Sequence, residues 1–170
     1  MRRALLLCYL LAILNSSTIF WVAAEDPYKT LDWTVRYGTI SPLGVPQRGI
    51  LINGQCPGPT VDCVTIDNVI VNIINKLDEP FLITWNGVQQ RKSSWQDGVL
   101  GTNYPIPPNT NWTYKMQMKD QIGTYTYFPS TLMHRAAGAF GAINIHHRSV
   151  IRIPYPEPAG EFTLIVGDWF

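Results

Sequence analysis

The sequence predicts an all-β protein, built as a Greek-key β-sandwich or barrel. Short apolar or alternating segments recur along the chain, and turn-forming residues separate them in SPLG, NGQCPGP, LDEP and NYPIPPN. No segment carries the apolar period of an amphipathic helix. Many short strands joined by Gly- and Pro-rich turns favour an antiparallel arrangement.

Residues 1–24 have the three parts of a secretory signal peptide. Arg2 and Arg3 precede the apolar run ALLLCYLLAIL, and small residues lead to a cleavage site that we place after Ala24. The apolar run is too short, and its continuation too polar, for a membrane-spanning helix. We therefore expect a secreted chain that begins at residue 25 and has no transmembrane span.

The charge balance argues against a nucleic-acid partner. The chain has 13 Lys and Arg against 12 Asp and Glu, and removal of Arg2 and Arg3 leaves 11 basic residues and a net charge of −1. A small basic spot at residues 90–92, with Lys115 and Lys119 on a later strand, is typical of a solvated face. No basic stripe remains to follow a phosphate backbone.

The strand signals follow one another along the chain. Residues 69–75 (VIVNIIN) are β-branched and nearly continuous in apolar character, as in a strand covered on both faces. In residues 111–118 apolar and polar side chains alternate, which marks a half-buried strand. Residues 122–128 and 138–147 add two further strands.

A change of composition marks the end of the first domain, which we place at residues 25–153. Three prolines in residues 152–160 (RIPYPEPAG) stiffen an extended segment, and we assign 154–160 as a linker. Residues 161–170 (EFTLIVGDWF) have a strand pattern, but a single strand cannot bury its apolar side chains alone. We therefore expect them to begin a second domain that is cut off.

Two covalent features are predicted for a secreted chain. Loss of residues 1–24 removes Cys8 and leaves Cys56 and Cys63. A bridge between these two would close a short loop and contribute about 2–3 kcal/mol, whereas the alternative is pairing with a part of the protein absent from this chain. The sequon that begins at Asn111 is a candidate glycosylation site.

Six motifs resemble, in order and spacing, the first cupredoxin (plastocyanin-like) domain of multicopper oxidases: NGQCPGP, TWNGVQQ, SWQDG, YPIPPNTNWTY, DQIGTYTYFPS and HRAAGAFGAINI. The resemblance runs from about residue 28 to residue 153. LDEPFLITWNG, QQRKSSWQDG and KDQIGTYTYFPS are most similar to the plant ascorbate-oxidase-like branch, which includes the skewed-growth (SKU-like) and pollen-specific proteins. This resemblance implies a cupredoxin fold and further cupredoxin domains C-terminal to this chain.

The resemblance also implies that copper ligands are missing. Active members carry four histidines, in a His-Trp-His-Gly and a His-x-His motif, that help hold a trinuclear copper cluster. Thr84, Asn86, Phe128 and Ser130 stand at those four positions. Because protein copper sites are built from imidazole, thiolate or thioether donors, we expect no copper, no other cofactor and no catalytic residue in this chain.

The remaining histidines do not replace the lost ligands. His134 lies beside the second motif, where the family places no ligand. His146 and His147 are adjacent on a predicted strand, so their side chains point to opposite faces and cannot chelate one ion together. We interpret all three as surface or hydrogen-bonded core histidines.

The retained motif residues Trp85, Gln89, Gln90, Trp95 and Asp97 form a candidate ligand surface. The tryptophans either pack in the core or expose flat faces on which a cell-wall sugar stacks while the amides bind its hydroxyls. Asp97 resembles an acid that lies beside the cluster in active relatives, and without a cluster we interpret it as a hydrogen-bond acceptor that orders its loop.

Three hypotheses for function follow. The first is a secreted, non-catalytic glycoprotein of the apoplast, cell wall or outer cell surface, for which the resemblance implies a role in directional or pollen-tube growth. The second is a copper-dependent oxidoreductase, similar to ascorbate oxidase or laccase, whose remaining copper site lies in missing C-terminal domains. The third is a truncated product that does not fold.

Overall fold

The computed structural model describes residues 27–150, 152–156 and 158–167. The predicted signal peptide, its cleavage site and Cys8 lie outside these ranges, as do the last three residues of the expected second domain. Within the described part of the chain, no helix has the length and apolar character needed to cross a membrane.

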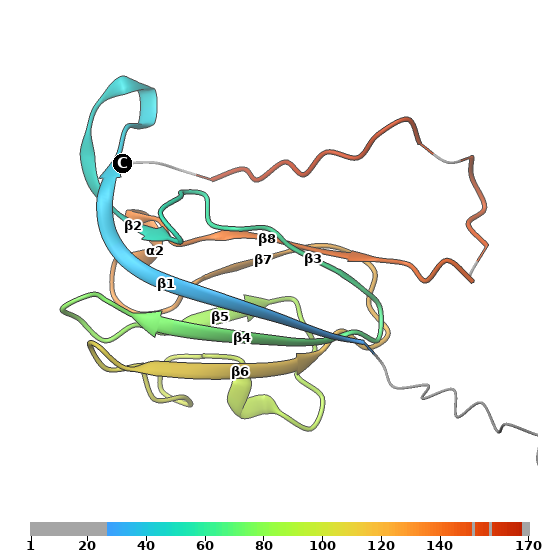
Figure 1. Ribbon diagram of the computed structural model, residues 1–170, viewed down its shortest axis with the longest axis horizontal. Coiled ribbons are helices and arrows are strands. Elements are labelled where there is room, and N and C mark those ends of the chain that lie inside the picture. Colours follow the sequence, from blue (N-terminus) through green and yellow to red (C-terminus); the bar gives the residue numbers. More distant parts are fainter. Residues whose placement is uncertain (1–26, 151, 157, 168–170) are drawn as a thin grey trace, which may run out of the picture.

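Eight strands form two four-stranded sheets that face each other (Figure 1). The first sheet has the order β2-β1-β4-β6, and the second has the order β3-β8-β7-β5. The strands are β1 (Tyr28–Ile40), β2 (Gln47–Ile52), β3 (Val61–Val64), β4 (Asn68–Asn75), β5 (Ile83–Asn86), β6 (Asn111–Gln117), β7 (Gly123–Pro129) and β8 (Gly141–His146). Three short helical turns join them: η1 (Pro42–Gly44), η2 (Ser94–Gln96) and α2 (His134–Ala137).

The predicted all-β sandwich is confirmed, but its strand pairing is mixed instead of antiparallel. β1 pairs in parallel with β4, and β3 pairs in parallel with β8. The reason is the path of the chain, which leaves the first sheet after β2, contributes β3 to the second sheet and returns with β4. Turn composition predicts local hairpins but carries no information about such a crossover.

The core lies between the two sheets and is built around large rings. Trp33 on β1 lies 4.7 Å from Tyr127 and 5.8 Å from Trp85 between ring centroids. Trp85 meets the ring of Tyr114 edge-on at 5.4 Å. All four side chains are nearly fully buried, so the two sheets are joined by aromatic packing at their centre.

β4 is covered on one face only, which corrects the expectation of a strand buried on both. Its residues alternate between fully and partly buried. At its end Asn75 is fully buried, and its side-chain amide donates to the carbonyl oxygens of Glu79 and Ile106, both at 2.9 Å. The backbone N–H of Leu77 donates to the Asn75 side-chain oxygen at 3.0 Å. This buried asparagine therefore anchors the segment that carries Ile106 to the central strand.

The cysteines do not form the bridge that the sequence allowed, and both are free thiols. Cys63 is buried in β3, whereas Cys56 is partly exposed in the turn before it. Burial raises the pKa of the Cys56 thiol. Burial, followed by the nearby Asp67 carboxylate, raises the pKa of Cys63 to about 11. Pairing with a cysteine elsewhere in the protein stays a prediction.

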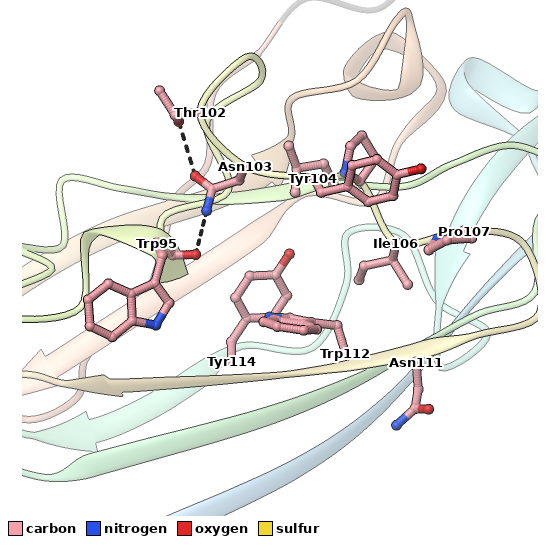
Figure 2. Close-up of a pocket in the computed structure, with 11 residues that line it drawn as sticks. Trp95, Thr102, Asn103, Tyr104, Ile106, Pro107, Asn111, Trp112 and Tyr114 are labelled. Atoms are coloured by element: carbon pink, nitrogen blue, oxygen red, sulfur yellow. Dashed lines mark hydrogen bonds between the residues drawn. The ribbon is translucent and has the colours of Figure 1, made fainter.

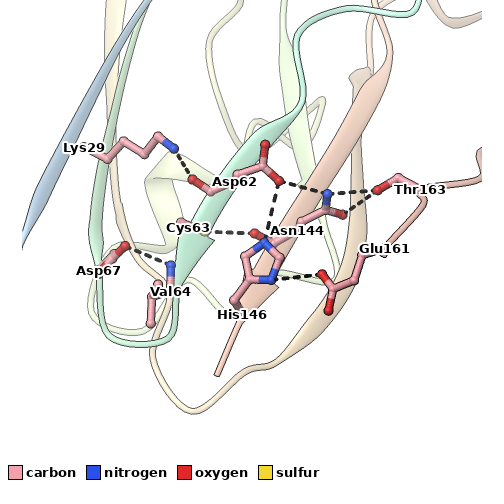
Figure 3. A network of polar contacts seen from close by, with 9 residues as sticks. All are labelled: Lys29, Asp62, Cys63, Val64, Asp67, Asn144, His146, Glu161 and Thr163. Atoms are coloured by element: carbon pink, nitrogen blue, oxygen red, sulfur yellow. Dashed lines mark hydrogen bonds and ion pairs between the residues drawn. The ribbon is translucent and has the colours of Figure 1, made fainter. Parts of the chain in front are cut away.

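The predicted strand over 161–170 is absent from its described part, residues 161–167. This segment runs beside β8 and is held by side chains (Figure 3). The Asn144 amide donates to the Thr163 hydroxyl at 2.9 Å, and His146 lies 3.6 Å from Glu161. Without a paired neighbour these residues stay extended, and their assignment to a second domain stays a prediction.

Candidate functional site

The four positions that the resemblance assigns to copper ligands lie together on one sheet face. Thr84 on β5 pairs directly with Phe128 on β7. Asn86 lies two residues beyond Thr84, and Ser130 lies two residues beyond Phe128. Because strand side chains alternate between faces, all four point to the same side of the β5–β7 pair.

Three of these four side chains are engaged by neighbouring groups of the protein. The Thr84 hydroxyl donates to a carboxylate oxygen of Asp97 at 3.3 Å, and the Ser130 hydroxyl donates to the Gly98 carbonyl at 2.6 Å. The Arg135 guanidinium lies 4.0 Å above the Phe128 ring. The fourth, Asn86, is exposed. The face that would carry imidazoles therefore carries hydroxyls, an amide and a ring.

The histidines occupy separate places. His134 is buried, with Nδ1 2.9 Å from the Thr131 hydroxyl and Nε2 3.1 Å from a Glu79 carboxylate oxygen, and it stacks on Phe81. His146 lies between Asp62 and Glu161 (Figure 3). The interpretation of His134 as a hydrogen-bonded core residue is confirmed. Over the described ranges, no group of three or more His, Cys, Asp or Glu side chains could hold a metal ion.

The five residues of the candidate ligand surface do not form one surface. Trp85 is only 1% exposed and belongs to the core, so its assignment to a surface is wrong and the alternative of core packing holds. Asp97 orders its loop through Thr84, as interpreted from the sequence. The Gln89 side-chain oxygen accepts a hydrogen bond from Arg91 at 3.1 Å.

The other two members differ from each other as well. Gln90 is partly buried, and its side-chain oxygen accepts a hydrogen bond from Ser93 at 3.4 Å, so it braces its own turn. Trp95, on η2, is 61% exposed. Only Trp95 therefore presents the free aromatic face that the sugar-binding interpretation requires.

Trp95 lines a pocket of about 400 Å³ that sequence reasoning missed (Figure 2). We call it the aromatic pocket. Tyr104 and Trp112, which are 87% and 49% exposed, supply two further rings. The lining residues are Leu82, Trp95, Thr102, Asn103, Tyr104, Pro105, Ile106, Pro107, Asn111, Trp112 and Tyr114.

The position of β6 explains this pocket. Trp112, Tyr114 and Met116 alternate on the inner face of β6, but only Tyr114 and Met116 are buried. Near the start of the strand that inner face is open, and Trp112 reaches the surface there. The alternating pattern gave Trp112 the correct face, but not its exposure. The sequence feature that could have indicated the pocket is the segment YPIPPNTNW, in which a Tyr and a Trp flank a Pro- and Asn-rich turn.

The loop that forms the other wall is held at several points. The Asn103 amide donates to the Trp95 carbonyl oxygen and ties the middle of the loop of residues 95–107 to its start (Figure 2). Gln96 is buried, and its side-chain oxygen accepts the Lys115 backbone N–H at 3.3 Å. The Tyr114 phenol lies at the floor of the pocket. Burial raises its pKa, so it stays a neutral hydroxyl.

The comparisons with known proteins agree with this geometry. The profile of the multicopper oxidase family matches residues 34–150. An L-ascorbate oxidase homolog from Nicotiana tabacum is 60% identical over 149 residues, which is 88% of this chain and 27% of the relative. The monocopper oxidase-like protein SKU5 from Arabidopsis thaliana is 54% identical over 86% of this chain and 25% of the relative. The chain thus spans about a quarter of the length of these relatives.

Solved structures of the same kind share the fold. The multicopper oxidase mgLAC matches with a TM-score of 0.67 and 32% identity, over 72% of this chain and 40% of that chain. A blue copper oxidase from Nitrosomonas europaea matches with a TM-score of 0.69 and 26% identity, over 75% of this chain and 41% of that chain. The chain therefore belongs to the multicopper oxidase family, in which it forms a domain of cupredoxin fold.

Proposed function

We propose that the protein is a secreted component of the plant cell wall or outer cell surface and that this domain has lost its copper ligands and is not catalytic. Its role is in directional or pollen-tube growth. The observation that carries the proposal is the side-chain chemistry at Thr84, Asn86, Phe128 and Ser130, which share one face of the β5–β7 pair.

Donor chemistry supports the loss of copper. High copper affinity requires several imidazole, thiolate or thioether groups that converge. A phenyl ring has no lone pair to give, and neutral hydroxyls are poor substitutes for imidazole. The hydroxyls of Thr84 and Ser130 are also committed to Asp97 and Gly98, so copper binding would break existing hydrogen bonds.

A second candidate function is a copper-dependent oxidoreductase whose remaining copper site lies in other domains. The name monocopper oxidase-like, which SKU5 and SKS2 of Arabidopsis thaliana carry, favours this alternative. Since the chain covers only about a quarter of these relatives, the rest of the protein has room for such a site.

Copper analysis of the full-length secreted protein tests the proposal. We expect no trinuclear-cluster copper after dialysis, and no oxygen uptake with ascorbate or a phenol. Chelator-sensitive turnover would favour the second candidate, and copper at the stoichiometry of an intact cluster would refute the loss of ligands. Replacing the four positions together by histidine gives the matched comparison, in which a gain of copper shows that the assay can detect a restored site.

Cell imaging tests the location. A fluorescent fusion of the full-length protein should stay with the wall or the outer cell surface after plasmolysis, and removal of residues 1–24 should retain it inside the cell. Treatment with a peptide N-glycosidase should lower the mass of the secreted protein, and Asn111→Gln should lose that shift if Asn111 carries the glycan. If the secreted fusion protein washes freely from the wall, the proposal of a wall or cell-surface component is contradicted.

A further inference from the structure

We infer that the aromatic pocket binds a neutral, β-linked polysaccharide of glucose or xylose units. This inference deepens the proposed wall function and rests on it. The pocket lies between the start of β6 and the loop of residues 95–107 (Figure 2). It shares no residue with the four positions assigned to lost copper ligands.

The exposed rings are the first observation. Trp95, Tyr104 and Trp112 keep 61%, 87% and 49% of their surfaces accessible and all line the same hollow. Single exposed aromatic residues are common on protein surfaces, but several around one concavity mark an interaction site. The volume of about 400 Å³ falls within the range of ligand sites.

The absence of charge is the second observation. None of the residues that line the pocket is ionised at neutral pH; its polar side-chain groups are the Asn103 amide, the Thr102 hydroxyl, the tyrosine phenols and the indole N–H groups. The cation of Arg91, in the preceding loop, is paired with Asp120 at 3.1 Å. The lining therefore suits an uncharged ligand better than an acidic polysaccharide such as pectin.

The chemistry of sugars indicates which ligand fits the aromatic pocket. A pyranose whose hydroxyls are all equatorial, such as glucose or xylose, presents a flat face of C–H groups and a rim of hydroxyls. Indole and phenol faces take the flat side, and amides and hydroxyls at the rim exchange hydrogen bonds with the sugar. The three rings come from two walls, so consecutive units of an extended β-linked chain can contact more than one ring.

The edge of β6 argues against an extended peptide as the occupant. A peptide would add itself to this edge strand through backbone hydrogen bonds. However, the outward N–H of Lys115 already donates to the Gln96 side chain at 3.3 Å. η2 also lies against this strand, so pairing along it would require η2 to move.

The loop is organised for binding before any ligand arrives. Phe81 and Ile106 exchange two backbone hydrogen bonds, at 3.0 and 2.8 Å, and Asn75 holds the Ile106 carbonyl from the core side. Asn103 ties the far part of the loop to Trp95. Because these contacts hold the loop backbone in place, less conformational entropy is lost when a sugar stacks on the rings that the loop carries.

A glycan on Asn111 would leave the pocket open. Figure 2 shows the Asn111 side chain on the face of β6 opposite to Trp112 and Tyr114. Its amide donates to the Asn72 side chain at 3.1 Å. A sugar attached there starts on the outer face of the sheet, at the border of the pocket and not in it.

Binding of soluble oligosaccharides to the full-length secreted protein tests the inference. Cellohexaose and xylohexaose are titrated by calorimetry and by tryptophan fluorescence, and oligogalacturonate is the acidic comparison. We expect binding of at least one neutral ligand and weaker binding of the acidic one. The two neutral ligands distinguish a glucan from a xylan as the source.

Variants locate the site. Trp95→Ala, Tyr104→Ala and Trp112→Ala should each raise the Kd at least about tenfold, which corresponds to about 1.4 kcal/mol. Tyr104 is 87% exposed, so its loss should leave folding intact. Trp95→Phe keeps a flat ring and should recover part of the affinity. Tyr28→Ala is the matched control, because Tyr28 is 65% exposed and lies outside the pocket.

The outcomes separate this inference from the proposed function. Binding that survives both Trp95→Ala and Tyr104→Ala, or that prefers oligogalacturonate, overturns the pocket while leaving a wall protein in place. The inference is also overturned if neither neutral ligand binds. This includes the case in which another domain covers the pocket, which would appear as protection of Trp95 fluorescence from quenching by acrylamide. Copper content and oxygen uptake, which test the proposed function, do not depend on any of these results.

Discussion

Replacement of Asn75 by alanine should destabilise the domain strongly, although Asn75 is a single uncharged residue at the end of a strand. Its side chain is fully buried and makes three hydrogen bonds, to the Glu79 and Ile106 carbonyls and from the Leu77 N–H. Asn72 lies on the other face of the same strand, partly exposed, and its side-chain oxygen accepts from Asn111 at 3.1 Å. Asn72→Ala is therefore the matched control.

The magnitude follows from what each lost hydrogen bond leaves behind. The Leu77 N–H becomes a buried donor without this acceptor, which costs about 1–3 kcal/mol. The Ile106 carbonyl keeps the Phe81 N–H at 3.0 Å, and the Glu79 carbonyl lies in a half-exposed residue, so these two losses cost less. With the small cavity left by the side chain, we expect Asn75→Ala to cost about 2–4 kcal/mol and Asn72→Ala less than about 1 kcal/mol.

Urea unfolding of the chain without residues 1–24, followed by tryptophan fluorescence, measures both variants. A single cooperative transition in the parent chain is required, and it would also exclude the hypothesis of a product that does not fold. The reasoning is refuted if Asn75→Ala costs no more than Asn72→Ala. Since Asn75 anchors Ile106, its replacement should also weaken sugar binding in the aromatic pocket of the full-length protein.

The other predictions concern backbone, thiols and pH. Gly98→Ala should lower the free energy of unfolding by more than about 3 kcal/mol, because a Cβ there would lie 1.7 Å from a backbone carbonyl oxygen. Gly101→Ala is the control: Gly101 also has a positive φ but lies in open space, so the loss should be only about 1–2 kcal/mol. Thermal unfolding measures both variants. Without reductant, iodoacetamide should label both Cys56 and Cys63 in the unfolded chain and Cys56 first in the native one, as peptide mass spectrometry would reveal; labelling that requires reduction would contradict free thiols. The pKa of Tyr37 is raised to about 12, first by burial and then by two neighbouring carboxylates, from 10 when unfolded. Folding therefore favours the neutral phenol, and its contribution to stability is complete below pH 10 and is lost between pH 10 and 12. In urea titrations at a series of pH values, the free energy of unfolding of Tyr37→Phe should fall less steeply across that window than that of the parent chain.

The sequence predicted the fold class and the position of most strands because these depend on local patterns. The alternation in residues 111–118 corresponds to β6, segment 122–128 contains all of β7 except its last residue, and segment 138–147 contains all of β8. The proposal that copper ligands are lost likewise rests on residue identity at Thr84, Asn86, Phe128 and Ser130. The parallel pairing of β1 with β4 was not predictable in this way, since it depends on which sheet the intervening strand joins.

Trp85 of the TWNGVQQ motif and Trp95 of the SWQDG motif show the limit most clearly. Trp85 and Trp95 lie ten residues apart in one motif region, and residue type alone assigns both equally to a core or to a surface. Trp85 is on β5 facing the opposite sheet, whereas Trp95 is on η2 beyond the edge of the sandwich. The same holds for the cysteines, whose close spacing in sequence permits a bridge that the strand geometry does not make.

The sequence by itself therefore determined the family and the sandwich, because motifs and periodicity are properties of the chain. Only the tertiary structure decided which aromatic rings face solvent and that Trp95, Tyr104 and Trp112 gather around one pocket. The physical reason is that exposure depends on what packs against a residue from elsewhere in the chain. Near the start of β6 the described residues cover the inner face only in part, and the space left between this face and the loop of residues 95–107 is the aromatic pocket.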